Sequence, residues 1–146
     1  MSKIRKGTPP HVRCLLWGRA AGRCQFAGCN RDLAMNPNTK EAVGIAEEAH
    51  IIAYTPNGPR GDKGLSEKYC CDIDNLMLLC HDCHKPIDAN PAKYSIKLLR
   101  EMKERHESRI RLVSGISDEK SSNLLIYDAN VGDAFQLSNY SRSSGT

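Results

Sequence analysis

The sequence predicts a small α+β domain with flanking helices, stabilised by a zinc ion. Three observations predict this class: two close cysteine pairs lie far apart in the chain, two segments carry apolar residues at helical spacing, and an extended segment lies between them. The chain has 146 residues, of which 40% are hydrophobic and 5% aromatic, so it allows one modest domain plus an appendage around a thin core. A structural metal would compensate for that thin core.

Cysteine spacing is the most informative pattern. Cys24 and Cys29 form a C-x4-C pair, and Cys80 and Cys83 form a C-x2-C pair. Two such pairs supply the four thiolates of a closed tetrahedral zinc site. The chain has seven cysteines, an odd number, and no apolar signal stretch follows Met1. We therefore expect a reducing cytoplasm with thiolates on zinc, and not a secreted disulfide scaffold. A run of about 18 apolar residues, which a membrane span needs, is missing.

The first expected helix covers residues 10–20. Pro10 favours a helix start, apolar residues recur at helical spacing, and Gly22 ends the pattern. This helix leads directly into the first cysteine pair. Gly28, just before Cys29, suits the turn of a zinc knuckle, in which backbone amides point at the sulfurs.

The middle of the chain is expected to hold a strand, a loop and a short helix. Residues 42–53 look extended, which places His50 on a strand. Residues 55–64 are so rich in proline and glycine that we expect an exposed, mobile loop beside the site. Asp72 and Asp74 favour the start of a helix over residues 72–79. This helix would place Asn75 at the mouth of the site.

A second long helix is expected from Ser95 to about residue 112, followed by a domain boundary near residue 115. Ser95 can cap this helix, and Leu98, Leu99, Met102 and Ile110 form its apolar face. Past residue 114 the composition becomes that of a linker. Residues 124–127 then form a short apolar run, which we expect to be the first strand of a further domain. The predicted organisation is a domain at 1–114, and a linker and strand at 115–146.

Positive charge is concentrated at the beginning of the chain. The net charge is +4, and seven basic residues precede the first acidic one, Asp32. Such a segment suits a phosphate backbone, because lysine and arginine release its condensed counterions. The alternative is a solvated face that only maintains solubility. The seven residues are Lys3, Arg5, Lys6, Arg13, Arg19, Arg23 and Arg31.

Three short motifs resemble the HNH endonuclease family over roughly residues 10–110. They are Ala-His-Ile around His50, Asp-Asn-Leu-Met-Leu-Leu-Cys around Asn75, and Cys-His-Asp-Cys-His-Lys around His84. The zinc pairs bracket them as in the cysteine-containing HNH subgroup. In that family a two-stranded ribbon and a helix bind one divalent cation, and this arrangement is called the ββα-metal fold. The resemblance implies a metal-dependent endodeoxyribonuclease acting on double-stranded DNA, with Mg²⁺ or Mn²⁺ as catalytic cation beside the structural zinc.

The resemblance also implies roles for the three motif residues. His50 would be the general base that takes a proton from the attacking water, since its ordinary pKa of about 6.5 suits that task near neutral pH. Asn75 would fix the His50 loop or the orientation of its imidazole. His84 would bind the catalytic cation through a neutral ring nitrogen.

The second ligand of the catalytic cation is left open by the sequence. Many HNH enzymes carry an aspartate directly before the base, whereas this chain has Ala49 there. Glu48 is the nearest substitute, and it shares a face with His50 if no bulge interrupts the strand. Glu47 and water are the alternatives. Asp88, four residues beyond His84, is expected to orient that histidine.

The remaining histidines and cysteines are expected to be structural. His81 lies inside the second knuckle, where intervening positions are usually solvated, so it is not counted as a ligand. His11 and His106 are expected on helix surfaces. Cys14 is expected in the core, and Cys70 and Cys71 are expected to have a packing role or none.

A narrower resemblance concerns the nuclease half of the HNH-SAVED effectors of bacterial CBASS antiphage defence. The segments Leu-Trp-Gly-Arg-Ala-Ala-Gly-Arg-Cys, Glu-Ala-His-Ile, Cys-His-Lys-Pro-Ile-Asp and Asn-Leu-Leu-Ile-Tyr-Asp-Ala-Asn-Val-Gly carry it. It implies a C-terminal SAVED-like sensor that this chain lacks, through which a cyclic oligonucleotide would act, and homo-oligomerisation of the full-length protein.

Two other functions fit the same motifs. A restriction or homing-type HNH nuclease would share the chemistry but cut at preferred sequences. A noncatalytic zinc-ribbon module would use the basic segment only to bind nucleic acid, and Ala49 in place of the usual aspartate favours it.

Overall fold

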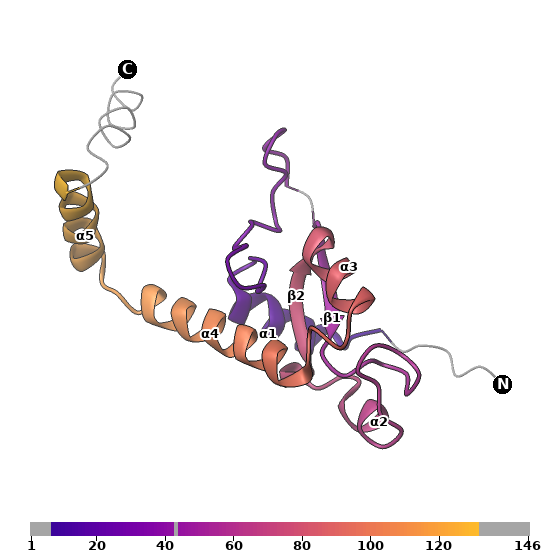
Figure 1. Ribbon diagram of the computed structural model, residues 1–146. Coiled ribbons are helices and arrows are strands. Elements are labelled where there is room, and N and C mark those ends of the chain that lie inside the picture. The colour runs from indigo at the N-terminus through magenta and orange to yellow at the C-terminus, as the bar shows by residue number, and fades with distance from the viewer. Residues whose placement is uncertain (1–6, 43, 132–146) are drawn as a thin grey trace. The chain divides into compact units, whose positions relative to one another are not determined.

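The computed structural model describes residues 7–42 and 44–131 (Figure 1). The chain divides into two compact units, residues 1–111 and 112–146, which are considered separately. The first unit is a small α+β structure, which is the class that the sequence predicts, and it is built on a two-stranded antiparallel sheet. The elements are α1 (Pro10–Ala20), β1 (Ala46–His50), α2 (Leu65–Tyr69), the 3₁₀ helix η1 (Ile73–Asn75), β2 (Leu76–Cys80), α3 (His81–Ala89), α4 (Ile96–Ser114) and α5 (Asp118–Val131).

The sheet pairs β1 with β2 in an unbroken register. Ala46 lies opposite Cys80 and His50 lies opposite Leu76, with the three pairs between them in sequence. The helix predicted over residues 72–79 is therefore wrong. Every residue of β2 is buried, so the Leu-Met-Leu-Leu run is apolar on both faces and not on one helical stripe.

The aspartates before β2 explain why the sequence resembles a helix start there. Asp72 Oδ1 accepts a hydrogen bond of 2.8 Å from the amide of Asp74, which is the capping contact expected of a helix N-terminus. The capped turn extends only through η1, because the next residues bury both of their faces in the sheet. The capping signal was thus correctly identified, but the segment that follows it was wrongly predicted to be a helix.

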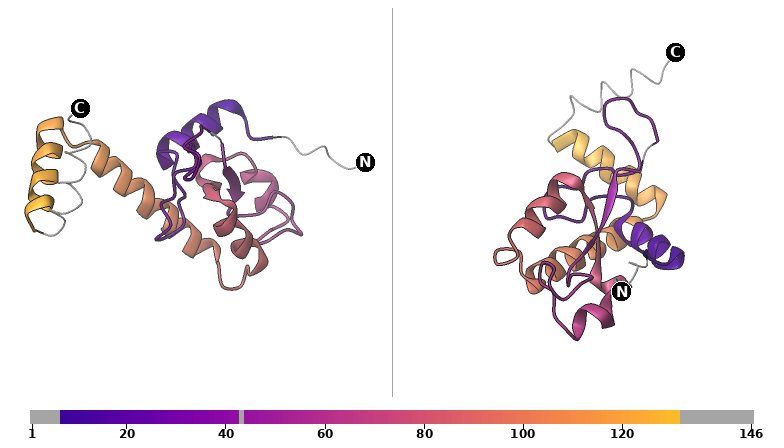
Figure 2. Two further views of the ribbon diagram at one scale, coloured as in Figure 1. Left: turned by 90° about the horizontal axis from the view of Figure 1, so that it is seen from above. Right: turned by 90° about the vertical axis from the view of Figure 1, so that its right-hand side faces the viewer.

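Helices α1 and α3 lie on opposite sides of the hairpin (Figure 2). Helix α1 spans the predicted residues, and Val12, Leu16 and Ala20 are its buried face. It ends where Ala21 and Gly22 adopt left-handed φ values of 54° and 63°. Both faces of β2 are thereby covered, which accounts for its complete burial.

Helix α4 begins where the sequence predicts, and Ser95 Oγ accepts a hydrogen bond of 3.2 Å from the amide of Leu98. Its buried face is less apolar than predicted, because the Lys103–Glu107 ion pair is buried beside Leu99. Gln25 links this pair to the sheet. Its Nε2 donates to Glu107 Oε1 over 3.1 Å, and its Oε1 accepts from the amide of Leu78 over 2.8 Å.

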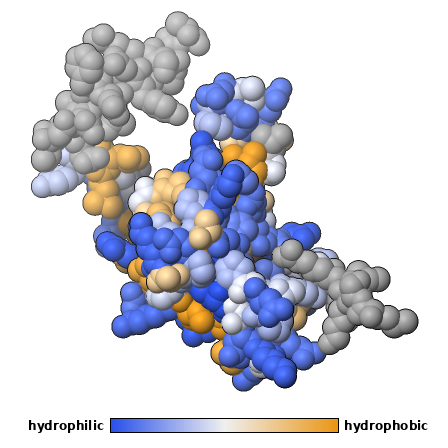
Figure 3. Space-filling model, turned by 45° about the vertical axis from the view of Figure 1, so that its right-hand side comes forward, coloured by the Kyte–Doolittle hydropathy of each residue, from blue (hydrophilic) through white to orange (hydrophobic). Residues whose placement is uncertain are grey.

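The apolar core lies between these helices and the hairpin. Fully buried side chains include Leu16, Leu33, Ile51 and Ile87 together with the residues of β2. The face in Figure 3 is mostly hydrophilic, with apolar residues in separate areas. None of the helices in the described part of the chain is both long and apolar enough to cross a bilayer.

The second unit corrects another expectation. Residues 124–127, predicted as a strand, are part of α5. Ser117 Oγ accepts a hydrogen bond of 3.3 Å from the amide of Lys120, and Asp118 and Glu119 occupy the first turn, all of which favour a helix. A helix satisfies its backbone locally, whereas a lone strand would leave its amides and carbonyls without partners. The rest of the expected appendage, residues 132–146, lies outside the described residues.

Candidate functional site

The four predicted cysteines form one cluster. The Sγ atoms of Cys24, Cys29, Cys80 and Cys83 all lie within 4.8 Å of one another, and those of Cys29 and Cys80 are 4.0 Å apart. Tetrahedral zinc with Zn–S bonds of about 2.3 Å requires sulfurs about 3.8 Å apart. The cluster therefore fits a metal ion such as zinc. Soft thiolates without a carboxylate or water are typical of a structural zinc ion.

Local backbone contacts bring the cysteines together. The Cys29 amide donates to the Phe26 carbonyl over 3.0 Å, and Gly28 has a left-handed φ of 85°, which closes the turn of the first pair. Cys80 ends β2, and Cys83 lies in the first turn of α3. The strand-to-helix junction thus supplies the second pair.

The thiols differ in how readily they ionise without a metal. Burial raises the pKa of Cys24 to about 11 and also raises the pKa of Cys83 above its ordinary value. Burial acts in the same direction on Cys80, but hydrogen bonds from Cys83, Cys24 and Cys29 bring the pKa of Cys80 below its ordinary value. Metal binding at neutral pH must therefore release protons, since the ligands are thiolates.

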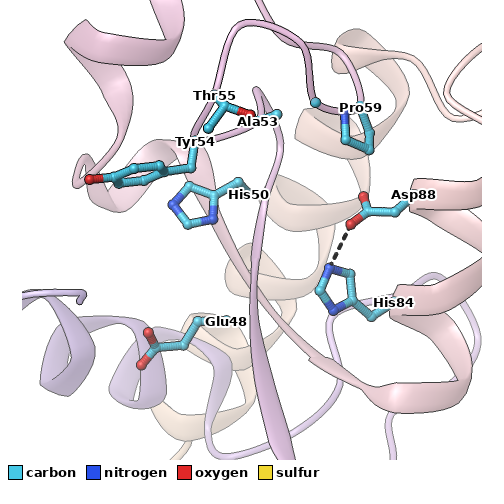
Figure 4. Close-up of a pocket in the computed structure, with 9 residues that line it drawn as sticks. Glu48, His50, Ala53, Tyr54, Thr55, Pro59, His84 and Asp88 are labelled. Carbon is cyan, nitrogen blue, oxygen red and sulfur yellow. Dashed lines mark ion pairs between the residues drawn. The ribbon is translucent and has the colours of Figure 1, made fainter. Parts of the chain in front are cut away.

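A second feature is a cavity of about 250 Å³, here called the histidine pocket (Figure 4). His50 at the end of β1 and His84 on α3 both line it, so the structure brings these two predicted residues to one cavity. Carboxylates from both elements join them. The nine lining residues are Glu48, His50, Ala53, Tyr54, Thr55, Gly58, Pro59, His84 and Asp88.

The orientation of His50 is set by the backbone. Its Nε2 donates a hydrogen bond of 2.9 Å to the Cys70 carbonyl, and its ring makes an edge contact with Tyr54 at a centroid distance of 5.9 Å. A carbonyl can only accept, so Nε2 carries the proton in the neutral ring. Nδ1 is then the basic nitrogen of that tautomer.

Asn75 does not line the histidine pocket but holds the backbone that follows His50. Its Oδ1 accepts from the Ile52 amide over 2.8 Å, while its Nδ2 donates to the Ile52 carbonyl over 2.9 Å and to the Tyr69 carbonyl over 3.1 Å. Tyr69 directly precedes Cys70, whose carbonyl contacts His50. A buried amide with three such bonds fixes the loop on both sides of the imidazole.

His84 has a carboxylate on each ring nitrogen. Its Nδ1 lies 2.5 Å from Glu47 Oε2, and its Nε2 lies 3.1 Å from Asp88 Oδ2. Glu47 also contacts His81 Nδ1 at 2.7 Å. Burial raises the pKa of Glu47, but the bonds from His81 and His84 outweigh it and hold that pKa below its ordinary value. His84 is thus surrounded by hard oxygen donors.

Glu48 lies on the same face of β1 as His50, because the ladder has no bulge. Its carboxylate forms an ion pair with Arg13 of α1. Burial raises the pKa of Glu48, but the Arg13 hydrogen bond outweighs it, so that the pKa is lowered overall. Of the two glutamates considered as ligands, Glu47 is therefore the one in contact with His84.

Sequence reasoning missed Arg60. The loop at residues 55–64 was predicted to be exposed and mobile, but the Arg60 side chain is only 4% exposed. It donates to the carbonyls of Ile51 over 2.7 Å and Ile87 over 2.9 Å, and to Asp88 Oδ1 over 2.8 Å. Gly61 makes this turn possible, since a Cβ there would lie 2.4 Å from the Pro56 carbonyl oxygen. The only sequence feature that could have indicated a buried role is the position of this arginine between a proline and a glycine.

Two further residues, His106 and Cys14, lie where the sequence did not predict. His106 was expected on a helix surface but is buried, and its Nε2 donates to the Ala20 carbonyl over 2.9 Å. Cys14 was expected in the core but is exposed. Helical phase alone could not decide the case of His106, because α4 carries polar residues on its buried face. Cys70 and Cys71 lie outside the cysteine cluster.

The two sites differ in how completely they are formed. Among the described residues, only the four cysteines converge as three or more possible metal ligands. The histidine pocket combines two imidazoles with carboxylates, an arrangement able to accept, hold and donate protons. Compared with models of protein families and with curated proteins, the sequence matches none.

Proposed function

We propose that this chain is a metal-dependent endonuclease of the HNH type, which hydrolyses phosphodiester bonds of double-stranded DNA. The observation that supports it most is the position of His50 and His84 at one cavity, one from the hairpin and one from the following helix. Asn75, the middle residue of the motif, holds the backbone after His50. The cysteine cluster would carry the structural zinc.

In this proposal His50 is the general base. With Nε2 donating to the Cys70 carbonyl, Nδ1 takes the proton from the attacking water. As the proton arrives, the imidazolium is stabilised by the carbonyl on its other nitrogen and by the nearby Glu48 carboxylate. Asn75 is a positioning residue, because it acts through the loop and not on the substrate.

His84 is the proposed ligand of the catalytic cation. The oxygens of Glu47 and Asp88 flank its ring, and this set of hard oxygen and imidazole donors suits Mg²⁺ or Mn²⁺. When bound, such a cation supplies Lewis-acid stabilisation of charge on the phosphate and on the departing 3′ oxygen. A neutral His84 ring would bind the cation through one nitrogen and donate a hydrogen bond through the other to the carboxylate that faces it, which orients the ring.

The wider proposal concerns biological role. By its resemblance to HNH-SAVED effectors, the chain is proposed to be the nuclease part of a cyclic-oligonucleotide-activated antiphage system, acting in the bacterial cytoplasm. The messenger would act through a sensor domain and would promote self-association of the full-length protein. Adding the messenger to the present chain should therefore leave its thermal stability unchanged.

Nicking of supercoiled plasmid tests the catalytic proposal. With Mg²⁺ or Mn²⁺ the wild-type chain should nick DNA, and His50→Ala should abolish nicking while retaining zinc and thermal stability. His11→Ala is the matched control, since His11 is an exposed histidine on α1, and it should cut like the wild type. Normal cutting by His50→Ala would refute the assignment of the base. Binding without nicking over a range of pH would favour the noncatalytic module, and discrete fragments would favour a sequence-specific nuclease.

A further inference from the structure

A second cavity, of about 380 Å³, is lined by residues of the loop of the first cysteine pair and of helix α4. It shares no lining residue with the histidine pocket. Arg105 and Arg109 of α4 line one wall, and Asn30 lines the other, while the lining includes neither aspartate nor glutamate. We call this cavity the arginine groove. Its size falls in the range of about 300–1,000 Å³ that is usual for ligand sites.

Two arginines line the arginine groove, and a third, Arg23, contacts its lining residue Asn30. Arg105 and Arg109 are one helical turn apart and so lie on the same face of α4. Arg109 Nη2 donates to Asn30 Oδ1 over 2.6 Å, and Arg23 Nη1 donates to the Asn30 carbonyl over 3.0 Å. Asn30, a neutral residue, thus accepts a hydrogen bond from one guanidinium group at its side chain and from another at its backbone carbonyl.

These three arginines lack carboxylate partners within the described residues. The glutamates of α4 within four positions of Arg105 have other partners: Glu101 lies 4.0 Å from Lys97, Glu104 accepts a hydrogen bond from Ser108, and Glu107 pairs with Lys103. Other basic side chains of the first unit do have acidic partners, as in the ion pairs Arg13–Glu48, Arg19–Asp74, Arg31–Asp82, Arg60–Asp88 and Lys103–Glu107. The arginine groove therefore gathers positive charge that the protein does not neutralise.

His106, which also lines the arginine groove, does not add to this charge. Burial lowers the pKa of His106, and its Nε2 donates to the Ala20 carbonyl. The groove thus presents guanidinium groups and a neutral imidazole. Planar guanidinium forks match the geometry of phosphate oxygens and suit them better than a point charge would.

The cysteine cluster holds the far wall of the groove in place. Asn30 directly follows Cys29, and the Cys24 amide donates to the Arg31 carbonyl over 2.9 Å, so the loop that carries Asn30 is fixed at both ends. The position of Asn30 against α4 therefore depends on the sulfur ligands. A metal at the cluster would preorganise the groove before any ligand arrives.

We propose that the arginine groove binds the phosphate backbone of nucleic acid and so anchors DNA at a second place, away from the histidine pocket. The choice of DNA as the ligand rests on the proposed function. A polyanion fits better than a single small anion, because two guanidinium groups line the groove and a third, that of Arg23, contacts Asn30 on its other wall. Each neutralised phosphate releases counterions, so the contact should be strongly dependent on salt.

The test is binding of a fluorescent duplex, measured by anisotropy in the His50→Ala background without divalent cation. Arg105→Gln/Arg109→Gln should weaken binding at least tenfold at low salt. It should also lower the slope of log Kobs against log salt by about 1.8, since each lost phosphate contact removes about 0.9. The matched control is Lys97→Gln/Arg100→Gln, which removes two charges from the same helix and should change affinity less than threefold. An unchanged slope in the groove variant, or an equal loss in the control, would overturn the proposal.

Folding and ligand class are checked in the same assay. Arg105→Gln alone keeps the Arg109–Asn30 bond, so it should weaken binding while zinc content and melting temperature stay at wild-type values. Inorganic phosphate, compared with chloride at equal ionic strength, should displace the duplex no better than chloride. Preferential displacement by phosphate would assign the groove to a small anion and overturn the polynucleotide assignment. Because no cleavage is measured, a chain that binds but never nicks would refute only the nuclease proposal.

Discussion

Replacing Arg60 with methionine should destabilise the first unit strongly, although Arg60 lies in a loop. Methionine keeps the unbranched stem but removes every donor. The side chain would lose its bonds to the carbonyls of Ile51 and Ile87 and its contact with Asp88. These bonds join the end of β1 to the end of α3, so the loss would loosen the two elements that carry His50 and His84.

The magnitude follows from the contacts. Two hydrogen bonds from a charged donor contribute about 1.5 kcal/mol each, and the pair with the half-exposed Asp88 adds about 0.5 kcal/mol after solvent screening. The expected loss is about 3.5 kcal/mol, which corresponds to a fall in melting temperature of about 10 °C for a chain of this size. That is a large part of the stability of about 5–15 kcal/mol typical of a protein domain.

Thermal unfolding followed by circular dichroism, with zinc present, measures this loss. Lys63→Met in the same loop is the matched control, because Lys63 is exposed, and it should shift the melting temperature by about 2 °C or less. If Arg60→Met melts within about 3 °C of the wild type, the contacts of Arg60 do not stabilise the fold as argued.

Two further predictions concern the cysteine cluster and His106. Cys29→Ser should abolish the binding of one zinc per chain and prevent cooperative unfolding, since structural zinc contributes on the order of 10 kcal/mol. Elemental analysis and thermal melting measure both effects. Cys14→Ser, at an exposed cysteine, is the control and should change neither the zinc content nor the melting temperature. Burial lowers the pKa of His106, so the unfolded chain takes up its proton first as the pH falls below about 6.5 and stability declines there. His106→Gln should flatten that decline in urea titrations between about pH 5 and 7, and an equally steep decline would contradict it.

The cysteine cluster could be predicted from sequence because spacing alone limits which sulfurs can meet. Close pairs at Cys24/Cys29 and Cys80/Cys83 need only one turn each, and the structure brings the two turns together. The position of His50 on a strand and the extent of α4 also follow from local pattern. In α4 and within each cysteine pair the deciding interactions lie within a few residues of one another.

The errors came from interactions between distant residues. The run Leu76–Leu79 fits a helix and a buried strand equally well, and only pairing with β1 decides between them. Arg60 appeared to be part of an exposed loop, because its acceptors on Ile51 and Ile87 are remote in sequence. His106 is buried, and its partner Ala20 lies 86 positions earlier in the chain.

The unbroken ladder between β1 and β2 also fixes the spacing between Cys80 of the cysteine cluster and His50 of the histidine pocket. Cys80 stands at one end opposite Ala46, and His50 stands at the other end opposite Leu76. Four steps of about 3.3 Å place these ends about 13 Å apart. Inserting or deleting one residue in either strand would turn every following side chain to the other face. The gain or loss of a single codon in either strand would therefore disrupt the relative placement of Cys80 and His50 as completely as removing either residue.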